Sequence, residues 1–261
     1  MLDSFGLIYK HRKLLLATTE QALRGRFVGN VLGAIWLALF PLLFLGMYSL
    51  VYVYVLGVRI PGLETDGYVL IIFCGLVPFL AFSEAFGVGT PSIVANRTLL
   101  RNTLFPIELV VVRDVIVGHA TMGLGMIMVW IAAAYQGHIY KVQLLVPVLY
   151  VMQILMTVGV VWITSTLTVF FRDLQQAVPI IVLFLMLVSP IAYTDDMVPV
   201  GMRALLDFNP LAWLMRLYRA FLVENSLPLG EFLIFSAFSV LLFVIGFRLI
   251  SRLKPLFSDY V

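Results

Sequence analysis

The sequence predicts an all-α integral membrane protein, on the basis of composition, charge-free runs and the small size of the polar segments. Of the 261 residues, 62% are hydrophobic and only 12% are charged, whereas a soluble domain needs far more polar surface. Residues 27–58, 115–140 and 142–171 contain no Asp, Glu, Lys or Arg. Each of these runs exceeds the roughly 20 residues that cross the hydrocarbon core of a bilayer. We therefore expect one transmembrane domain over 1–261 and no soluble catalytic domain.

Six transmembrane helices are expected. Short polar segments separate the apolar stretches, which lie at 31–57, 68–90, 107–134, 143–169, 176–193 and 231–250. An even number of spans places both ends of the chain on one side of the membrane. Twelve of the 17 Lys and Arg residues fall on that side, and basic loops stay in the cytoplasm. The termini are therefore predicted to be cytoplasmic, with spans one to five inside 31–194 and the last span and tail in 231–261.

The N-terminal segment 1–30 is predicted to lie in the membrane interface as an amphipathic helix. Its basic residues, including Arg12 and Arg24, are interspersed with apolar side chains, as in helices that lie on a bilayer surface. Glu20 precedes Arg24 by four residues, which is the favourable order for an ion pair on one helix face. The segment is either a functional interface helix or only an anchor for the first span.

The segment 195–230, between the last two spans, is too apolar for a simple loop. Asn209 and Pro210 form a typical helix start, an N-cap followed by proline. An apolar stripe follows at helical spacing, flanked by Arg216 and Arg219: Leu211, Leu214, Met215, Tyr218, Phe221 and Leu222. Each half is too short to cross a bilayer. We expect a short re-entrant helical hairpin that dips into the outer leaflet or caps a channel mouth; the alternative is an interfacial hairpin without a gating role.

The cytoplasmic loop 91–106 is a second candidate for function. It is predicted to form a short apolar helix between two prolines, with four polar side chains: Asn96, Arg97, Arg101 and Asn102. The segment is either a connector that follows the positive-inside rule or a docking helix for a cytoplasmic partner.

Charged residues inside transmembrane helices are rare and costly, so Glu84 is of interest. It is a proton or substrate site, a partner for a buried cation, or a polar pin between helices, and the pin is favoured if Glu84 lies near the cytoplasmic end of its span. His119 is expected to form a hydrogen bond between helices.

Aromatic residues make up 13% of the chain. Most such side chains in membrane proteins face lipid or form interfacial belts. A pore for a sugar chain would also need them, because the apolar faces of sugars stack on aromatic rings while their hydroxyls find polar groups. The candidates for such a channel wall are Trp36, Tyr48, Tyr52, Phe79, Phe82, Phe86 and Tyr193.

Several function classes are disfavoured by what the sequence lacks. It has no G-x-x-x-x-G-K-[ST] phosphate loop, no H-E-x-x-H, no G-x-S-x-G and no Cys/His metal spacing around its one cysteine, Cys74. We therefore expect no catalytic residues, no metal site and no ATPase activity in this chain. The net charge of +3 is spread over the ends and loops as the positive-inside rule predicts, so it does not indicate nucleic acid.

The order of short motifs along nearly the whole chain resembles the permease subunits of bacterial polysaccharide ABC exporters, which serve O-antigen, capsule and teichoic acid. The motifs are Arg24-Gly-Arg-Phe-Val-Gly-Asn-Val-Leu-Gly33 before Trp36, Gly75-Leu-Val-Pro-Phe79, Phe82-Ser-Glu-Ala85, Asn96-Arg-Thr-Leu-Leu100, Phe105-Pro106, Phe171-Arg-Asp-Leu174, Ser189-Pro-Ile-Ala-Tyr193, Asn209-Pro-Leu and Tyr218-Arg219.

The resemblance implies a half-transporter of the bacterial inner membrane that dimerises around one channel and exports a lipid-linked polysaccharide. Two copies of a separate ABC ATPase would bind the ATP and Mg²⁺, so this chain would hold no cofactor. By the same resemblance, the interface helix would carry Arg12, Glu20 and Arg24. Asn96, Arg97, Arg101 and Asn102 would contact the ATPase from the coupling helix 91–106. The outer gate would include Arg216, Tyr218 and Arg219.

Three alternatives remain open. The first is an ABC permease whose cargo is a drug or a simple lipid. The second is an ion-coupled secondary transporter, for which Glu84 is the best intramembrane acid. The third is a membrane-embedded enzyme acting on lipid-linked sugars, which would need a cluster of charged residues at one interface, and we find none in the sequence.

Overall fold

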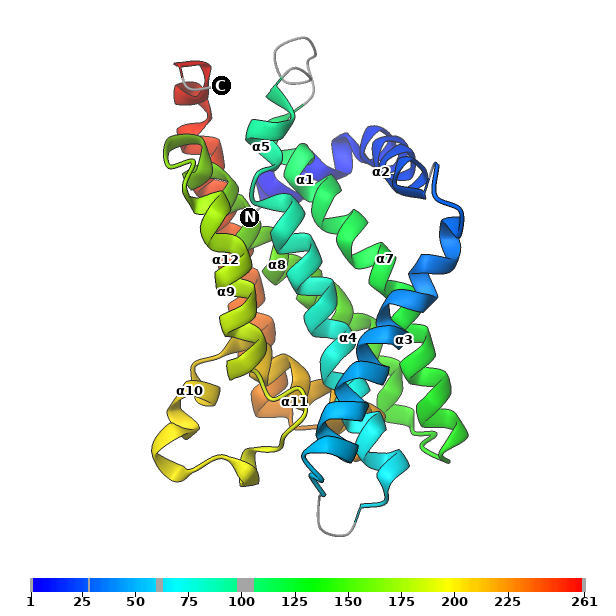
Figure 1. Cartoon of the computed structure of the whole chain (residues 1–261). Helices are drawn as coiled ribbons and strands as arrows, with labels where there is room; N and C mark the ends of the chain where they lie inside the picture. Colours follow the sequence, from blue (N-terminus) through cyan, green and yellow to red (C-terminus); the bar gives the residue numbers. More distant parts are fainter. Residues whose placement is uncertain (1, 28, 60–62, 98–105, 260–261) are drawn as a thin grey trace.

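The computed structural model describes residues 2–27, 29–59, 63–97 and 106–259, and the secondary structure within them is helical (Figure 1). Five helices of this part of the chain are long and apolar enough to cross a membrane. They are Gly33–Val55, which contains α3 (Trp36–Ser49); α4 (Thr65–Gly89); α7 (Ile107–Tyr135); Lys141–Phe170, which contains α8 (Val146–Phe170); and Leu229–Phe257, which contains α12 (Leu229–Leu253). These bounds confirm five of the six expected spans to within a few residues, except that the last helix runs further toward the C-terminus.

The stretch expected as the fifth span is shorter than predicted. Helix α9 (Leu174–Val188) has 15 residues, which is about 22 Å at 1.5 Å per residue, against a hydrocarbon core of about 30 Å. It ends where Ser189 adopts an extended conformation with ψ of 140°. The following residue is Pro190, and a residue before proline is disfavoured in the helical region. The expected helical boundary at 193 is therefore wrong.

Helices α1 (Leu2–Lys10) and α2 (Arg12–Phe27) lie across one end of the bundle, the end that also holds α5 (Ser92–Ala95) and the C-terminus (Figure 1). Leu15 and Thr19 of α2 are buried, while most of its basic residues are exposed. The interfacial segment predicted over 1–30 is thus two helices. Gly29 and Gly33, with φ of 84° and 48°, make the turn from α2 toward α3, a conformation that glycine adopts without strain.

The centre of the fold is the pair α4 and α7, together with the pair α8 and α12. In α4, 78% of the most apolar window is buried inside the chain, against 6% for the helix that contains α3. Close backbone approach explains the tight pairs: a Cβ added at Gly118 of α7 would lie 2.8 Å from the Cα of Ala85 in α4. Gly159 of α8 and Gly246 of α12 meet in the same way. The absence of a side chain lets these helices touch.

The segment after α9 forms short helical pieces at the end opposite α2, followed by one longer helix (Figure 1). These are η4 (Asp195–Met197), η5 (Val200–Met202), α10 (Arg203–Asp207) and α11 (Pro210–Leu222). Helix α11 starts as predicted, because the Asn209 side chain accepts a hydrogen bond from the Leu211 N–H at 3.0 Å. All six residues of the predicted apolar stripe are buried, so α11 packs into the bundle.

Candidate functional site

A cavity of about 560 Å³ opens between the end of α2 and helices α3, α4, α7 and α9. Most of its wall is apolar, and it includes Trp36, Phe40, Phe44 and Phe79. A polar group made of Arg26, Ser83, Glu84 and Thr121 also faces it. The cavity is therefore an amphipathic chamber inside the bundle, with its charges concentrated in one place.

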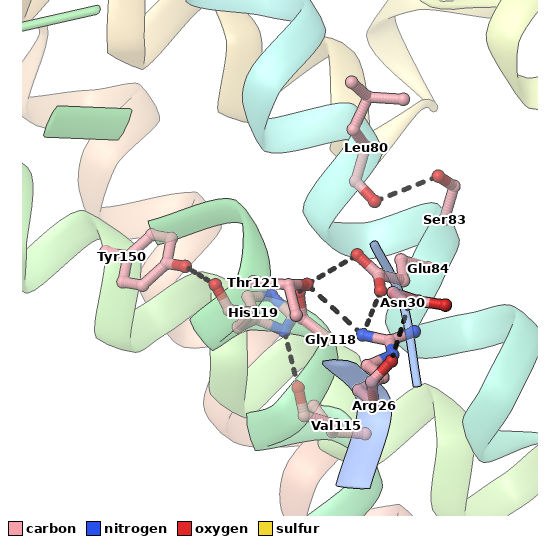
Figure 2. A network of polar contacts seen from close by, with 10 residues as sticks. All are labelled: Arg26, Asn30, Leu80, Ser83, Glu84, Val115, Gly118, His119, Thr121 and Tyr150. Atoms are coloured by element: carbon pink, nitrogen blue, oxygen red, sulfur yellow. Dashed lines mark hydrogen bonds and ion pairs between the residues drawn. The ribbon is translucent and has the colours of Figure 1, made fainter. Parts of the chain in front are cut away.

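Glu84 is the centre of that polar group (Figure 2). One carboxylate oxygen forms an ion pair with Arg26 of α2. The other accepts a hydrogen bond of 2.7 Å from the Thr121 hydroxyl of α7. The Glu84 side chain is 19% exposed and that of Arg26 is 32% exposed. Of the roles considered for Glu84, this geometry fits a polar pin, since three helices meet at one carboxylate.

Arg26 was not singled out as a site residue from the sequence. It stood beside Arg24 in the basic N-terminal segment, and both follow the same amphipathic pattern. The two differ in the structure: Arg24 pairs with Glu20 at 2.5 Å on the exposed face of α2, with side chains 77% and 62% exposed. The predicted Glu20–Arg24 pair is confirmed. Arg12 donates to the Tyr9 carbonyl at 3.0 Å and lies over the Tyr9 ring.

His119 departs from its predicted role. Its ring nitrogen Nδ1 lies 3.0 Å from the Val115 carbonyl of its own helix, so the predicted bond from the ring to another helix is wrong. The contact between helices instead uses the His119 backbone carbonyl, which accepts a hydrogen bond of 2.5 Å from the Tyr150 hydroxyl of α8 (Figure 2).

The seven aromatic residues predicted as a channel wall separate into groups. Trp36 and Phe79 line the cavity, together with Phe40 and Phe44, which the sequence reasoning had not selected and whose ring centroids lie 4.8 Å apart. The remaining members lie elsewhere. Phe82 and Phe86 are buried and stack on each other at 5.6 Å, and Tyr48 and Tyr52 stack at 5.7 Å.

Tyr193 lies outside the cavity, in the segment that follows α9. Its hydroxyl donates to the Val188 carbonyl at 2.7 Å. The phenol therefore acts as a hydrogen-bond donor to the end of α9.

The predicted coupling residues are only partly in view, since Arg101 and Asn102 lie outside the described residues, as do 98–105 as a whole. Helix α5 covers Ser92–Ala95 of the predicted helix. Asn96 donates to the Ser92 carbonyl at 2.8 Å and accepts from Arg113 of α7 at 3.2 Å. Arg113 also pairs with Asp114 at 2.7 Å. Arg97 is exposed. The Asn96 amide thus joins α5 to α7.

At the opposite end, Arg219 and Arg216 occupy different environments, although both were predicted to flank the apolar stripe. Arg219 is only 5% exposed. It donates to three backbone carbonyls of the segment after α9, those of Pro190 (2.5 Å), Ile191 (2.9 Å) and Tyr193 (3.1 Å). Arg216 instead pairs with Asp195 at 2.7 Å and with Asp207 at 3.5 Å.

The third predicted gate residue, Tyr218, is fully buried. Its hydroxyl donates to the Gln153 side chain of α8 at 3.0 Å, and the Gln153 amide donates to the Pro78 carbonyl of α4 at 2.9 Å. Tyr218 therefore connects α11 to α8 and, through Gln153, to α4, whereas Arg219 connects α11 to the segment after α9. Among the described residues, no group of three or more His, Cys, Asp and Glu could hold a metal ion.

Comparison with known proteins identifies the family. Residues 13–223 match the family described as ABC-2 type transporter, which covers most of the chain. The chain belongs to the ABC-2 type transporter family. This permease is 27% identical to the O-antigen export system permease protein RfbA of Klebsiella pneumoniae, over 94% of each chain.

The permease is also similar to two further proteins. It is 29% identical to the protein of the same name from Myxococcus xanthus, over 86% of this chain and 85% of the relative. It is 25% identical to the polysialic acid transport protein KpsM of Escherichia coli, over 87% and 88%. The family match, over residues 13–223, includes every residue that lines the cavity and extends to the end of α11.

Proposed function

We propose that this permease is the channel-forming half of an ATP-driven exporter that moves a lipid-linked polysaccharide of the O-antigen, capsule or teichoic acid type across the bacterial cytoplasmic membrane. The observation that carries the proposal is similarity over nearly the full length to permeases named for O-antigen export and polysialic acid transport. The five helices that are long and apolar enough to cross a membrane support it, because a transmembrane channel is built from such helices.

The energy would come from a partner. The sequence lacks a phosphate loop, so two copies of an ABC ATPase would bind ATP and Mg²⁺ and dock on the end that holds α2 and α5. A second copy of the permease would complete the channel. The little-buried helix that contains α3 and the exposed side chains of α9, such as Ile180 and Phe184, would then face the partner copy or lipid.

The topology in this proposal is the six-span one. Helix α9 would be the fifth of the six crossings along the chain. It would be completed by the non-helical residues after Val188, whose backbone carbonyls accept hydrogen bonds from the Arg219 guanidinium. Segments η4 to α11 would form the re-entrant outer gate, and both termini would be cytoplasmic. Irregular backbone is tolerated at membrane depth where it is buried in protein, and the three carbonyls bound by Arg219 meet this condition.

The cavity offers a surface for the glycan. Four aromatic rings line it, those of Trp36, Phe40, Phe44 and Phe79. The apolar faces of sugars stack on such rings whatever the order of sugars in the glycan. An aromatic wall of this kind would let a long polymer slide through. The other predicted channel residues, Tyr48, Tyr52, Phe82, Phe86 and Tyr193, do not line this cavity; their roles remain predictions.

The test is export by a purified complex. The permease would be co-expressed with the ATPase of its own gene cluster, reconstituted into vesicles and supplied with the lipid-linked glycan. We expect the ATPase to co-purify and ATP to drive glycan across the bilayer, and a hydrolysis-deficient ATPase variant to abolish export. Export without any ATPase, or no stable complex with one, contradicts the proposal.

One observation favours a second candidate, an ABC permease for a drug or simple lipid. A mostly apolar cavity of about 560 Å³ lies in the size range of small-molecule sites. The same vesicles distinguish the two: ATP-dependent movement of a fluorescent amphiphile or phospholipid, with no movement of glycan, supports this candidate and contradicts the first.

A further inference from the structure

The contact among Arg26, Glu84 and Thr121, here called the polar junction, connects three helices that are far apart in the chain. Arg26 lies in the last turn of α2, Glu84 lies in α4 near its end, and Thr121 lies in α7 (Figure 2). The ion pair and the 2.7 Å hydrogen bond both end on the Glu84 carboxylate. A change in the position of α2 therefore acts on α4 and α7 at one point.

Helix α2 packs on α7, and among its described side chains Leu15 and Thr19 are buried. The chain then leaves α2 through Gly29 and Gly33, whose positive φ angles break helical continuity, and a Cβ built at either glycine would contact nothing within 4 Å. Helices α2 and α3 are therefore not one continuous rod. The junction adds a polar contact from α2 to α4 beside the packing of α2 on α7.

Helix α7 also receives polar contacts from other segments at this end of the molecule. Lys254, which follows α12, lies 3.1 Å from Glu108. Arg113 donates to Asn96, the residue that ends α5. Arg26 of α2 also lies 3.5 Å from the Thr121 hydroxyl of α7. Helix α7 thus contacts α2, α5 and the residue that follows α12, and it connects these three segments.

We propose that Arg26 and Glu84 are positioning residues that transmit displacement of α2 to α4 and α7 and so change the shape of the cavity. The inference deepens the proposed function and rests on it. Arg26, Glu84 and Thr121 all line the cavity beside Trp36 and Phe79, so a shift of the junction changes the wall of the cavity. Glu84 accordingly acts as one half of a mechanical link.

The partial exposure of both side chains suits this role. A fully buried ion pair is costly to separate, because each charge would be left without a partner, whereas exposed pairs contribute little and exchange readily. With side chains 32% and 19% exposed, Arg26 and Glu84 lie between these limits. The pair is strong enough to hold α2 in place, and water can reach it when the helices separate.

The experiment uses the reconstituted complex with its ATPase and measures glycan exported per ATP hydrolysed. Arg26→Gln and Glu84→Gln each remove one charge with little change of shape. We expect ATP hydrolysis to continue and the amount of glycan exported per ATP to fall about fivefold or more. A fivefold change is at the lower end of the range typical of coupling between two sites. The exchanged pair, Arg26→Glu with Glu84→Arg, should restore most of the loss. Lys141→Gln is the control, because it removes an exposed charge outside the three helices of the junction and outside the end proposed for ATPase docking, and it should change nothing.

A second arm measures the position of α2 and needs no transport. Thr19→Cys is placed in a Cys74→Ala background and treated with a water-soluble thiol reagent. Thr19 is buried, so the cysteine should be protected in the otherwise unchanged chain and become reactive when Glu84→Gln is added. Leu16→Cys, at an exposed position of α2, should react equally in both backgrounds.

Three results overturn the inference. Export per ATP that is unchanged in Glu84→Gln, or that is lost without recovery in the exchanged pair, shows that the ion pair does not transmit the movement. The third is a Thr19→Cys that stays protected when Glu84 is replaced. Failure of the proposed function looks different: the unmodified complex then exports no glycan, while the thiol arm still decides whether the junction holds α2.

Discussion

Two arginines at opposite ends of the molecule hold helices in different ways. Arg26 pairs with another side chain, the Glu84 carboxylate, and both are partly exposed. Arg219 is buried and donates to the backbone carbonyls of Pro190, Ile191 and Tyr193. The first contact joins two charges that can separate. The second contact supplies hydrogen bonds to backbone carbonyls that have no partner within a helix, because α9 has already ended.

The difference separates a movable joint from a fixed one. Backbone carbonyls left without partners inside an apolar environment are costly, so the contacts of Arg219 must persist in every state that keeps the segment after α9 buried. The Glu84 carboxylate can instead exchange Arg26 for water. We therefore expect the contact of Arg26 with Glu84 to change during transport. The contacts of Arg219 with the segment after α9 should persist, so that α11 and this segment move as one unit.

The largest effect is expected for Arg219→Met. The change leaves three carbonyls unpaired. A buried acceptor without a partner costs about 1–3 kcal/mol, so we expect the free energy of unfolding to fall by at least about 3 kcal/mol. Unfolding in mixed detergent micelles measures it. Arg216→Met is the control, because Arg216 pairs with Asp195 and Asp207, which are partly exposed. This substitution should reduce the free energy of unfolding by at most about 1 kcal/mol. Equal stability of the two variants would show that the carbonyl cluster contributes nothing.

Replacing each of the two arginines by lysine tests the same difference with a smaller change. Lysine at position 26 can still pair with Glu84 and should reduce the free energy of unfolding by less than about 1 kcal/mol. At position 219 a single ammonium cannot reproduce the fork of the two guanidinium nitrogens that serve three carbonyls, so Arg219→Lys should cost about 2 kcal/mol. The same unfolding assay decides. If both lysine variants lose equal stability, the distinction between a movable and a fixed contact is wrong.

Much of the fold could be predicted because long apolar runs have few alternatives to membrane helices. The bounds of the helices around α3 and α8 follow from charge-free sequence, and those of α4 and α7 from long apolar stretches with few charges. The start of α11 follows from Asn209 and Pro210. The end of α9 was misplaced because hydropathy continues through Tyr193, whereas backbone geometry before Pro190 ends the helix at Val188. Local steric rules outweighed the apolar pattern at this point.

The site was less accessible from sequence. Glu84 was recognisable as a charge within a span, but its partner depends on how α2 crosses the bundle, and nothing local distinguishes Arg26 from Arg24. Similarly, helical spacing placed Arg219 beside an apolar stripe, and only the path of the segment after α9 brings the three carbonyls to it. Phe40 and Phe44 were missed because any aromatic residue in a span fits a lipid-facing position equally well.

The smallest loss of stability is expected for a second contact to the segment after α9, the segment that Arg219 also binds. The Tyr68 hydroxyl of α4 donates to the Ala192 carbonyl at 2.6 Å, and this bond is buried. Tyr68→Phe removes only the hydroxyl, so the free energy of unfolding should fall by about 1 kcal/mol. Tyr193→Phe is a suitable control, because its phenol donates to Val188 from a half-buried position where water can replace it. In Arg219→Met the segment has already lost its main donor, so Tyr68→Phe should add less than in the unmodified chain if the two residues hold one unit. Full additivity of the two losses would show that Tyr68 and Arg219 act on the segment independently.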